Sequence, residues 1–190
     1  MSTVVRKRDR PKGTSFQQPL ESKAIQPAEV LLAYVICLHL TAIPQVNRKW
    51  YLYLRIEWET GIKPGEGLNI KVNDIFPDRI RIYRFKKSSR LEDFVPIQLA
   101  LYNELQQYIT QYGIRGKLFP ETIQGAKYIW DAIKVKANLR KYLTLQSFRY
   151  GFGYNFLNQV KGLPINEALA QLQRKLKYEN ISFMRKVWGV

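Results

Sequence analysis

Segments with strand character are confined to one short region of this sequence, and helical patterns occupy the chain on both sides of it. NIKVNDIF (69–76), RIRIYRF (79–85) and DFVPI (93–97) read as strands, and the polar KKSSR reads as the turn between the last two. The pattern predicts a three-stranded antiparallel meander. A sheet of that size cannot form a whole core, so helices must build most of it.

Signals that begin and end helices recur through the rest of the chain. QPAEVLLAYVICLHL and NRKWYLYLRIEWETG predict the first two helices, with Pro27 in the first turn of one and Gly61 at the end of the other. Further helices are expected in KPGEGLNI, LALYNELQQYITQYG, TIQGAKYIWDAIKVKANL, LQSFRYGFGYNFL, LPINEALAQLQRKL and ISFMRKVW. The predicted fold class is therefore mainly α with a small three-stranded antiparallel sheet (α+β).

The charge balance indicates a polyanionic partner. The 190 residues carry 31 Lys and Arg against 15 Asp and Glu, a formal net charge of +16. Nucleic acid is the first candidate for the partner, ahead of an anionic membrane surface or a protein that is merely basic. VLLAYVICLHL, the one membrane-like run, has about half of the roughly 20 residues needed to span a bilayer, so it predicts a core helix and no membrane partner.

Cysteine and histidine are too scarce for a disulfide or a zinc site. Cys37 is the single cysteine and His39 the single histidine, so we expect no metal and no cofactor. The absence of a disulfide suits a reducing compartment, and no signal-peptide pattern is evident. These features predict an intracellular protein, located with DNA and not secreted.

The chain divides into a basic arm and one folded domain. Residues 1–24 are predicted to be a flexible arm and residues 25–190 the domain. Five cations of the arm are candidate DNA contacts: Arg6, Lys7, Arg8, Arg10 and Lys12. Pro11 and Gly13 discourage a helix there. A solvated tail and a localisation signal are the alternatives.

Four blocks of the sequence resemble, in order and spacing, the catalytic domain of tyrosine recombinases, the phage-integrase family. TGIKPGEGLNIKVNDI is similar to the family block T-G-L-R-x-x-E-L-L-x-L-x-W-x-D-I, and RFKKSSRLEDFVPI resembles the hairpin that presents a lysine. LQSFRYGFGYNFL is similar to H-x-L-R-H-T-F-A-T-x-L-L, and LKYENISFMRKVW to L-G-H-x-x-I-x-T-T-x-x-Y. The resemblance runs from about Ser22 to the C-terminus and implies the fold of that catalytic domain.

The resemblance also implies a chemistry. In the family, a tyrosine attacks a DNA phosphodiester and forms a 3′-phosphotyrosine link, while two arginines neutralise the phosphate. A hairpin lysine protonates the leaving 5′ oxygen, and two histidines, or a histidine and a tryptophan, assist. Fixed cationic donors are needed because charge develops on the non-bridging oxygens, and the planar fork of arginine can hold two of them.

Carried over position by position, the family's site is only partly present in this chain. Arg149 stands at the second arginine position, and Lys63 replaces the first arginine, keeping the charge without the fork. Gln146 and Tyr178 stand at the two histidine positions. The nucleophile position falls on Val187, which cannot attack a phosphate.

Each of these residues also has a plain structural interpretation. Lys63 could be a surface lysine at a helix end, and Gln146 a helix residue without a role. Lys86 or Lys87 is the candidate hairpin lysine, although both, with Arg90, could simply keep the hairpin soluble. Tyr178 and the neighbouring Trp188 could be packing residues.

Arg149 is the strongest of these candidates. It is predicted to share a helix face with Gln146 near a helix start capped by Thr144, where amide donors attract anions.

The favoured hypothesis is a DNA-binding protein that keeps this fold, lacks the nucleophile and binds duplex phosphates. Its expected contacts are Arg6, Lys7, Arg8, Arg10, Lys12, Lys63, Lys86, Lys87, Arg90 and Arg149. The alternative is an active site-specific recombinase, whose nucleophile would have to be Tyr178, another tyrosine such as Tyr150 or Tyr154, or a partner's tyrosine.

An RNA-binding basic domain is the second alternative, although RIRIYRF is expected to carry no exposed aromatic strand motif. The chain ends soon after the nucleophile position, so we expect a monomer or a weak homo-oligomer.

Overall fold

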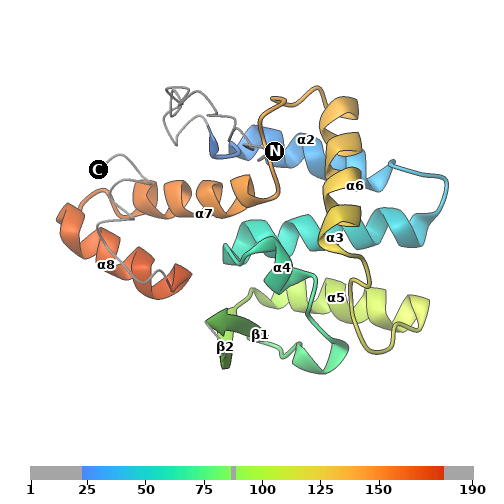
Figure 1. Cartoon of the computed structure of the whole chain (residues 1–190), viewed down its shortest axis with the longest axis horizontal. Coiled ribbons are helices and arrows are strands. Elements are labelled where there is room, and N and C mark those ends of the chain that lie inside the picture. The colour runs from blue at the N-terminus through green and yellow to red at the C-terminus, as the bar shows by residue number, and fades with distance from the viewer. Residues whose placement is uncertain (1–22, 87–88, 178–190) are drawn as a thin grey trace, which may run out of the picture.

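The structure, a computed structural model, describes residues 23–86 and 89–177, and its elements follow the predicted order of helices, sheet and helices (Figure 1). They are α2 (Pro27–Leu38), α3 (Pro44–Thr60), α4 (Pro64–Gly67), the 3₁₀-helix η1 (Val72–Asp74), β1 (Arg79–Lys86), β2 (Ser89–Pro96), α5 (Leu99–Tyr112), α6 (Ile123–Lys136), α7 (Gln146–Gln159) and α8 (Ile165–Leu176).

Several predictions from the sequence fall on residues outside the described ranges. They concern the arm cations Arg6, Lys7, Arg8, Arg10 and Lys12, the hairpin residue Lys87, the expected last helix ISFMRKVW, and Tyr178, Val187 and Trp188.

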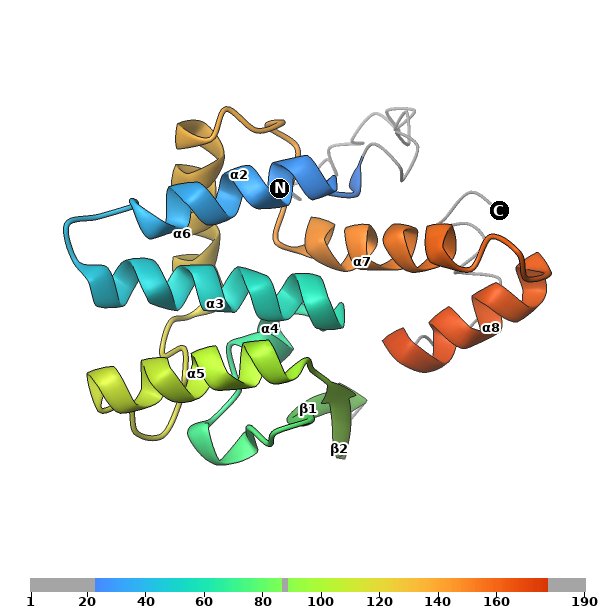
Figure 2. The same cartoon turned by 180° about the vertical axis from the view of Figure 1, so that it is seen from behind.

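Helix α3 is the centre of the packing. It contacts α2, α5 and α7, and Figures 1 and 2 show α2 and α5 on opposite sides of it. Its side chains Trp50, Tyr53, Leu54 and Ile56 are all buried, as an element covered on several sides requires. The helix ends at Gly61, whose φ of 64° is the left-handed conformation that glycine adopts without strain.

The sheet has two strands, and the prediction of three is wrong. β1 and β2 pair antiparallel, with Ile80 opposite Val95, and both side chains point into the core. The expected first strand instead forms η1, flanked by isolated bridges only. The cause is local: the Asp74 carboxylate accepts a hydrogen bond from the Lys71 backbone N–H at 2.9 Å, which closes a turn where a ladder would have continued.

Helices α7 and α8 extend from one end of α3 and contact each other (Figure 1). Leu169, Leu172 and Leu176 of α8 form a separate buried cluster, against which Phe152 and Phe156 of α7 pack. None of the described helices is both long enough and apolar enough to cross a membrane.

Glycine at position 151 lets α7 approach its neighbours closely. A Cβ there would lie 2.6 Å from the Ile25 carbonyl oxygen and 2.7 Å from the Trp58 ring. The backbone carbonyl and the half-buried Trp58 indole cannot both withdraw, so no larger side chain fits without strain. Gly125 in α6 differs, because its nearest neighbour would be the Thr122 hydroxyl at an ordinary 3.5 Å.

We expect Gly151→Ala to lower the free energy of unfolding by about 1–3 kcal/mol through overpacking. The control Gly125→Ala should leave it unchanged or raise it by up to about 1 kcal/mol, because alanine favours the helix. Urea denaturation followed by circular dichroism measures both. Equal effects of the two substitutions would contradict the close approach of α7.

Candidate nucleic-acid interface

Lys63 lies in a tight connection between α3 and α4. Its backbone N–H donates to the Glu66 carboxylate at 2.9 Å, and Pro64 occupies the first helical position. The Lys63 side chain is exposed. With Gly65, Glu66, Asn69 and Tyr83 it lines a pocket of about 280 Å³, so the turn presents a cation at the edge of a concave surface.

A larger pocket of about 590 Å³ adjoins the first one. Its lining comes from the start of α4, one face of α6 and the segment that leads into α7: Pro64, Gly65, Ile123, Lys127, Trp130, Asp131, Lys134, Leu143, Thr144, Leu145 and Gln146. Gly65 borders both pockets. The fold therefore brings Gln146 to the same surface as the Lys63 turn, although they are far apart in the sequence.

The predicted helix cap at Thr144 is wrong. α7 begins at Gln146, and the residue at its N-cap is Leu145. The Thr144 backbone N–H donates to the Ser147 hydroxyl at 3.0 Å, and the Thr144 carbonyl accepts from the Ser147 N–H at 2.9 Å. This turn holds Thr144 through its backbone and leaves its side chain on the pocket lining rather than on the helix N–H groups.

Arg149 is buried and links three helices. Only 1% of its surface is exposed, its Nη1 donates to the Gly61 carbonyl at 2.5 Å, and its Nη2 donates to the Leu176 carbonyl at 2.6 Å. Both carbonyls lie at helix C-terminal ends, where the dipole favours a cation. The geometry thus assigns Arg149 a packing role, and its contact with a DNA phosphate stays a prediction.

The structure describes only some of the hairpin residues that the sequence analysis named. Lys86 pairs with Ser89 at the end of β1, and its side chain, like the whole of Lys87, lies outside the described part. Arg90 is exposed, with its guanidinium carbon 3.7 Å from the centre of the Tyr83 ring. Among the described residues, Arg90 thus presents a cation on the hairpin.

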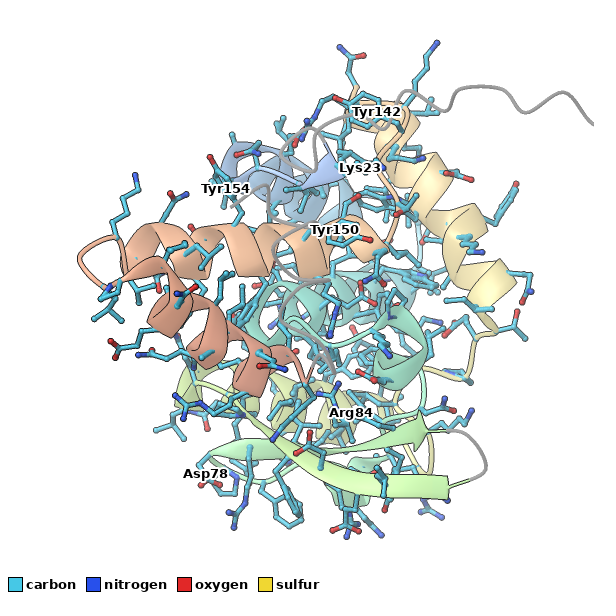
Figure 3. All side chains as sticks on the ribbon, turned by 60° about the vertical axis from the view of Figure 1, so that its left-hand side comes forward. Lys23, Asp78, Arg84, Tyr142, Tyr150 and Tyr154 are labelled. Carbon is cyan, nitrogen blue, oxygen red and sulfur yellow. The ribbon has the colours of Figure 1, made fainter. Side chains whose placement is uncertain are left out.

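Arg84 is a site residue that the sequence analysis missed. Its Nε donates to the Asp93 carboxylate at 3.0 Å, and its Nη1 lies 3.4 Å from the Glu66 carboxylate. Figure 3 shows Arg84 on the side of the hairpin that faces the helices. The alternation of side chains along the strand could have predicted this position, because Arg84 falls on the same face as the buried Ile80 and Ile82. The ion pair attaches the hairpin to the α4 turn that carries Lys63.

Glu57 is the second residue that the sequence analysis missed. It is 0% exposed, and neither of its carboxylate oxygens has a hydrogen-bond partner among the described residues. The nearby Tyr53 hydroxyl donates to the Pro64 carbonyl at 3.2 Å. Burial raises the pKa of the Glu57 carboxyl well above its ordinary value, and the Glu66 charge also acts to raise it. Glu57 is therefore a buried carboxyl with a raised pKa close to α4, because a Cβ at Gly67 would lie 3.8 Å from its Oε1.

The sequence of the chain matches no protein-family model, and no curated protein matches it significantly. Solved structures do match its fold. The XerH site-specific recombinase bound to difH substrate has a TM-score of 0.71 at 15% identity, over 88% of this chain and 50% of XerH. The XerA recombinase has a TM-score of 0.68 at 15% identity, over 96% of this chain and 62% of XerA.

The catalytic domain of bacteriophage HP1 integrase also matches, with a TM-score of 0.62 at 17% identity, over 86% of this chain and 85% of that domain. The chain thus has the fold of tyrosine-recombinase catalytic domains, and the resemblance found in the sequence is confirmed for the fold. This chain spans about half the length of the XerH chain.

Glu57 should make stability depend on pH. The pKa of this carboxyl is higher in the folded than in the unfolded chain. Its contribution to the stability of the fold is therefore complete at a pH below the unfolded-state pKa, and it is lost as the pH rises through the folded-state pKa. We expect the melting temperature of Glu57→Gln, relative to the parent, to increase as the pH is raised from about 5, above the ordinary pKa of a glutamate. The exposed control Glu92→Gln should show no such trend, and a constant difference for Glu57→Gln would contradict the assignment.

Removing the Arg149 guanidinium should loosen the junction of α3, α7 and α8. Arg149→Met leaves the Gly61 and Leu176 carbonyls buried without this donor, so we expect the free energy of unfolding to fall by about 3 kcal/mol. The exposed control Arg115→Met should change it by less than about 0.5 kcal/mol. Chemical denaturation measures both, and a fully stable Arg149→Met would show that the guanidinium does not hold the junction.

Proposed function

We propose that this protein binds duplex DNA through its phosphates and does not cut it. The observation that carries the proposal is the meeting of the Lys63 turn, the start of α7 and the basic face of α6 around two adjoining pockets. The same fold occurs in XerH in complex with its difH substrate. The net charge of +16 supplies the attraction for a polyanion.

Lys63 and Lys127 are the central contacts in this proposal. Both side chains are exposed. Lys63, at the N-cap of α4, lines the smaller pocket, and Lys127 of α6 lines the larger one. Lys134 is less available, because it pairs with Asp131 at 2.7 Å and donates to the Lys141 carbonyl. Phosphate contacts of this kind give strong binding that depends on salt and little on base sequence.

Further cations extend this surface in the proposal. Arg90 and the two hairpin lysines, Lys86 and Lys87, would contact one flank of the duplex, and the arm of residues 1–24 would follow a groove. Arg149 would support the site by fixing α7 against α3 and would reach a phosphate only where its carbonyl contacts open.

The absence of cutting rests on the residue at the nucleophile position. The Val187 side chain has no nucleophilic group, and covalent catalysis needs one. The alternative of an active recombinase requires another tyrosine, and the structure offers Tyr83, which lines the pocket beside Lys63. Tyr150 and Tyr154 lie on α7 (Figure 3).

A salt series with a duplex oligonucleotide tests the binding. The logarithm of the affinity should fall linearly with the logarithm of the salt concentration, and Lys63→Gln or Lys127→Gln should each reduce that slope by about 0.9, the loss of one phosphate contact. Lys161→Gln is the matched control, because this exposed lysine follows the far end of α7. If the salt slopes of Lys63→Gln and Lys127→Gln equal that of Lys161→Gln, neither lysine contacts a DNA phosphate.

A nicked duplex that traps a covalent intermediate separates binding from cutting. The proposal expects no protein–DNA adduct on a denaturing gel. An adduct that disappears with Tyr83→Phe, Tyr150→Phe or Tyr154→Phe would establish the active recombinase instead.

A further inference from the structure

The outer face of the β-hairpin carries arginines and aromatic rings in alternation. Arg79, Arg81 and Tyr83 project from one face of β1, because side chains two apart share a face. The register places Phe94 opposite Arg81 on the same face. The opposite face holds the buried Ile80, Ile82 and Val95. Figure 3 shows the outer side chains directed away from the helices.

These side chains are joined by a continuous series of cation–π contacts. The Arg79 guanidinium lies 5.9 Å from the centre of the Phe76 ring and 5.4 Å from that of Phe94. Arg81 lies 6.0 Å from Phe76 and 5.9 Å from Tyr83. At the other end, Arg90 covers Tyr83 at 3.7 Å. We call this set the hairpin stack: Phe76, Arg79, Arg81, Tyr83, Arg90 and Phe94.

The hairpin stack is partly open to solvent, because Phe76, Arg81 and Tyr83 are half-buried. Phe94 is 44% exposed, although a phenylalanine on a small sheet would ordinarily point inward, and Arg79 and Arg90 are exposed. The sequence analysis expected no exposed aromatic strand motif in RIRIYRF, and the exposed Phe94 lies outside that segment, on the neighbouring strand β2. The register between β1 and β2 places Phe94 on this face, and the sequence of one strand alone does not reveal that register.

We propose that the hairpin stack binds single-stranded DNA. Unpaired bases expose the faces that stack on aromatic rings and on guanidinium planes, whereas the bases of a duplex are already stacked. Alternate residues on the strand are about 7 Å apart, so the rings and guanidinium groups present several stacking positions in a row. An acidic peptide would use the arginines but would leave the rings uncovered.

The charges around the stack favour stacking over simple ion pairing. Asp78 lies 3.6 Å from Arg79, and Asp74 lies 2.8 Å from Arg81, so two of the three arginines already have carboxylate partners. Glu92 also falls on this face, opposite Tyr83. Binding should therefore depend less on salt than binding at the lysine-lined pockets does.

The hairpin stack adjoins the proposed duplex site. Tyr83 belongs to the stack and also lines the pocket beside Lys63. An unpaired strand that leaves a duplex at that pocket would reach the stack directly. The inference does not depend on duplex binding, because Phe76, Arg79, Arg81 and Phe94 of the stack do not line the two pockets of the proposed duplex site.

Fluorescence anisotropy with a labelled oligo(dT) of about 20 nucleotides tests the proposal, since stacking sites span about 4–16 nucleotides. We expect Phe94→Ser to weaken oligo(dT) binding about 10-fold, which corresponds to one lost stacking contact, and to leave duplex binding within about 2-fold. Leu91→Ser is the matched control, because Leu91 is 47% exposed on the opposite face of the same strand. It should change neither affinity.

Arg90→Lys is the second variant, and it guards against a hairpin that fails to fold. Lysine keeps the charge but lacks the planar group, so oligo(dT) binding should fall while the melting temperature stays unchanged. If Phe94→Ser and Arg90→Lys bind oligo(dT) as tightly as Leu91→Ser does, the proposal is overturned. It is also overturned if the two variants lose duplex binding as strongly as they lose oligo(dT) binding. Tighter binding of oligo(U) than of oligo(dT) would assign the stack to RNA instead.

Discussion

The buried guanidinium of Arg149 is the interaction on which this arrangement depends. This guanidinium is buried at 1% exposure, and the carbonyl oxygens of Gly61 and Leu176 compensate its lost hydration. Those oxygens close the C-terminal ends of α3 and α8, so one side chain sets how α3, α7 and α8 meet. The start of α7, with Gln146, is placed by the same junction.

A second set of charges positions the turn that presents Lys63. Glu66 accepts from the Lys63 backbone and also pairs with Arg84 of the hairpin, so the turn, α4 and the sheet form one unit. Glu57 lies buried near this unit without a hydrogen-bond partner among the described residues, and burial raises the pKa of its carboxyl. The outward faces of this unit are the ones that carry exposed lysines, arginines and rings.

Much of the fold could be predicted from local pattern, and the exceptions have identifiable causes. The order of helices and sheet followed from periodicity and from stop signals such as Gly61, and the tyrosine-recombinase resemblance is confirmed for the fold. The predicted first strand failed because the Asp74 carboxylate closes a turn, which strand propensity does not register. The Thr144 cap failed because the residue at the N-cap of α7 is Leu145, one position later, and Thr144 lines the pocket instead.

The sequence by itself determined the charge excess, the absence of a tyrosine at position 187 and the residue types at Lys63, Gln146 and Arg149. Only the tertiary structure decided how those residues are used. It buried Arg149, left Lys63 exposed and placed Gln146 on a pocket that α4 and α6 share. The physical reason is that burial and pairing are properties of contacts between distant segments, and no local pattern specifies which charge will meet a carbonyl and which will meet solvent.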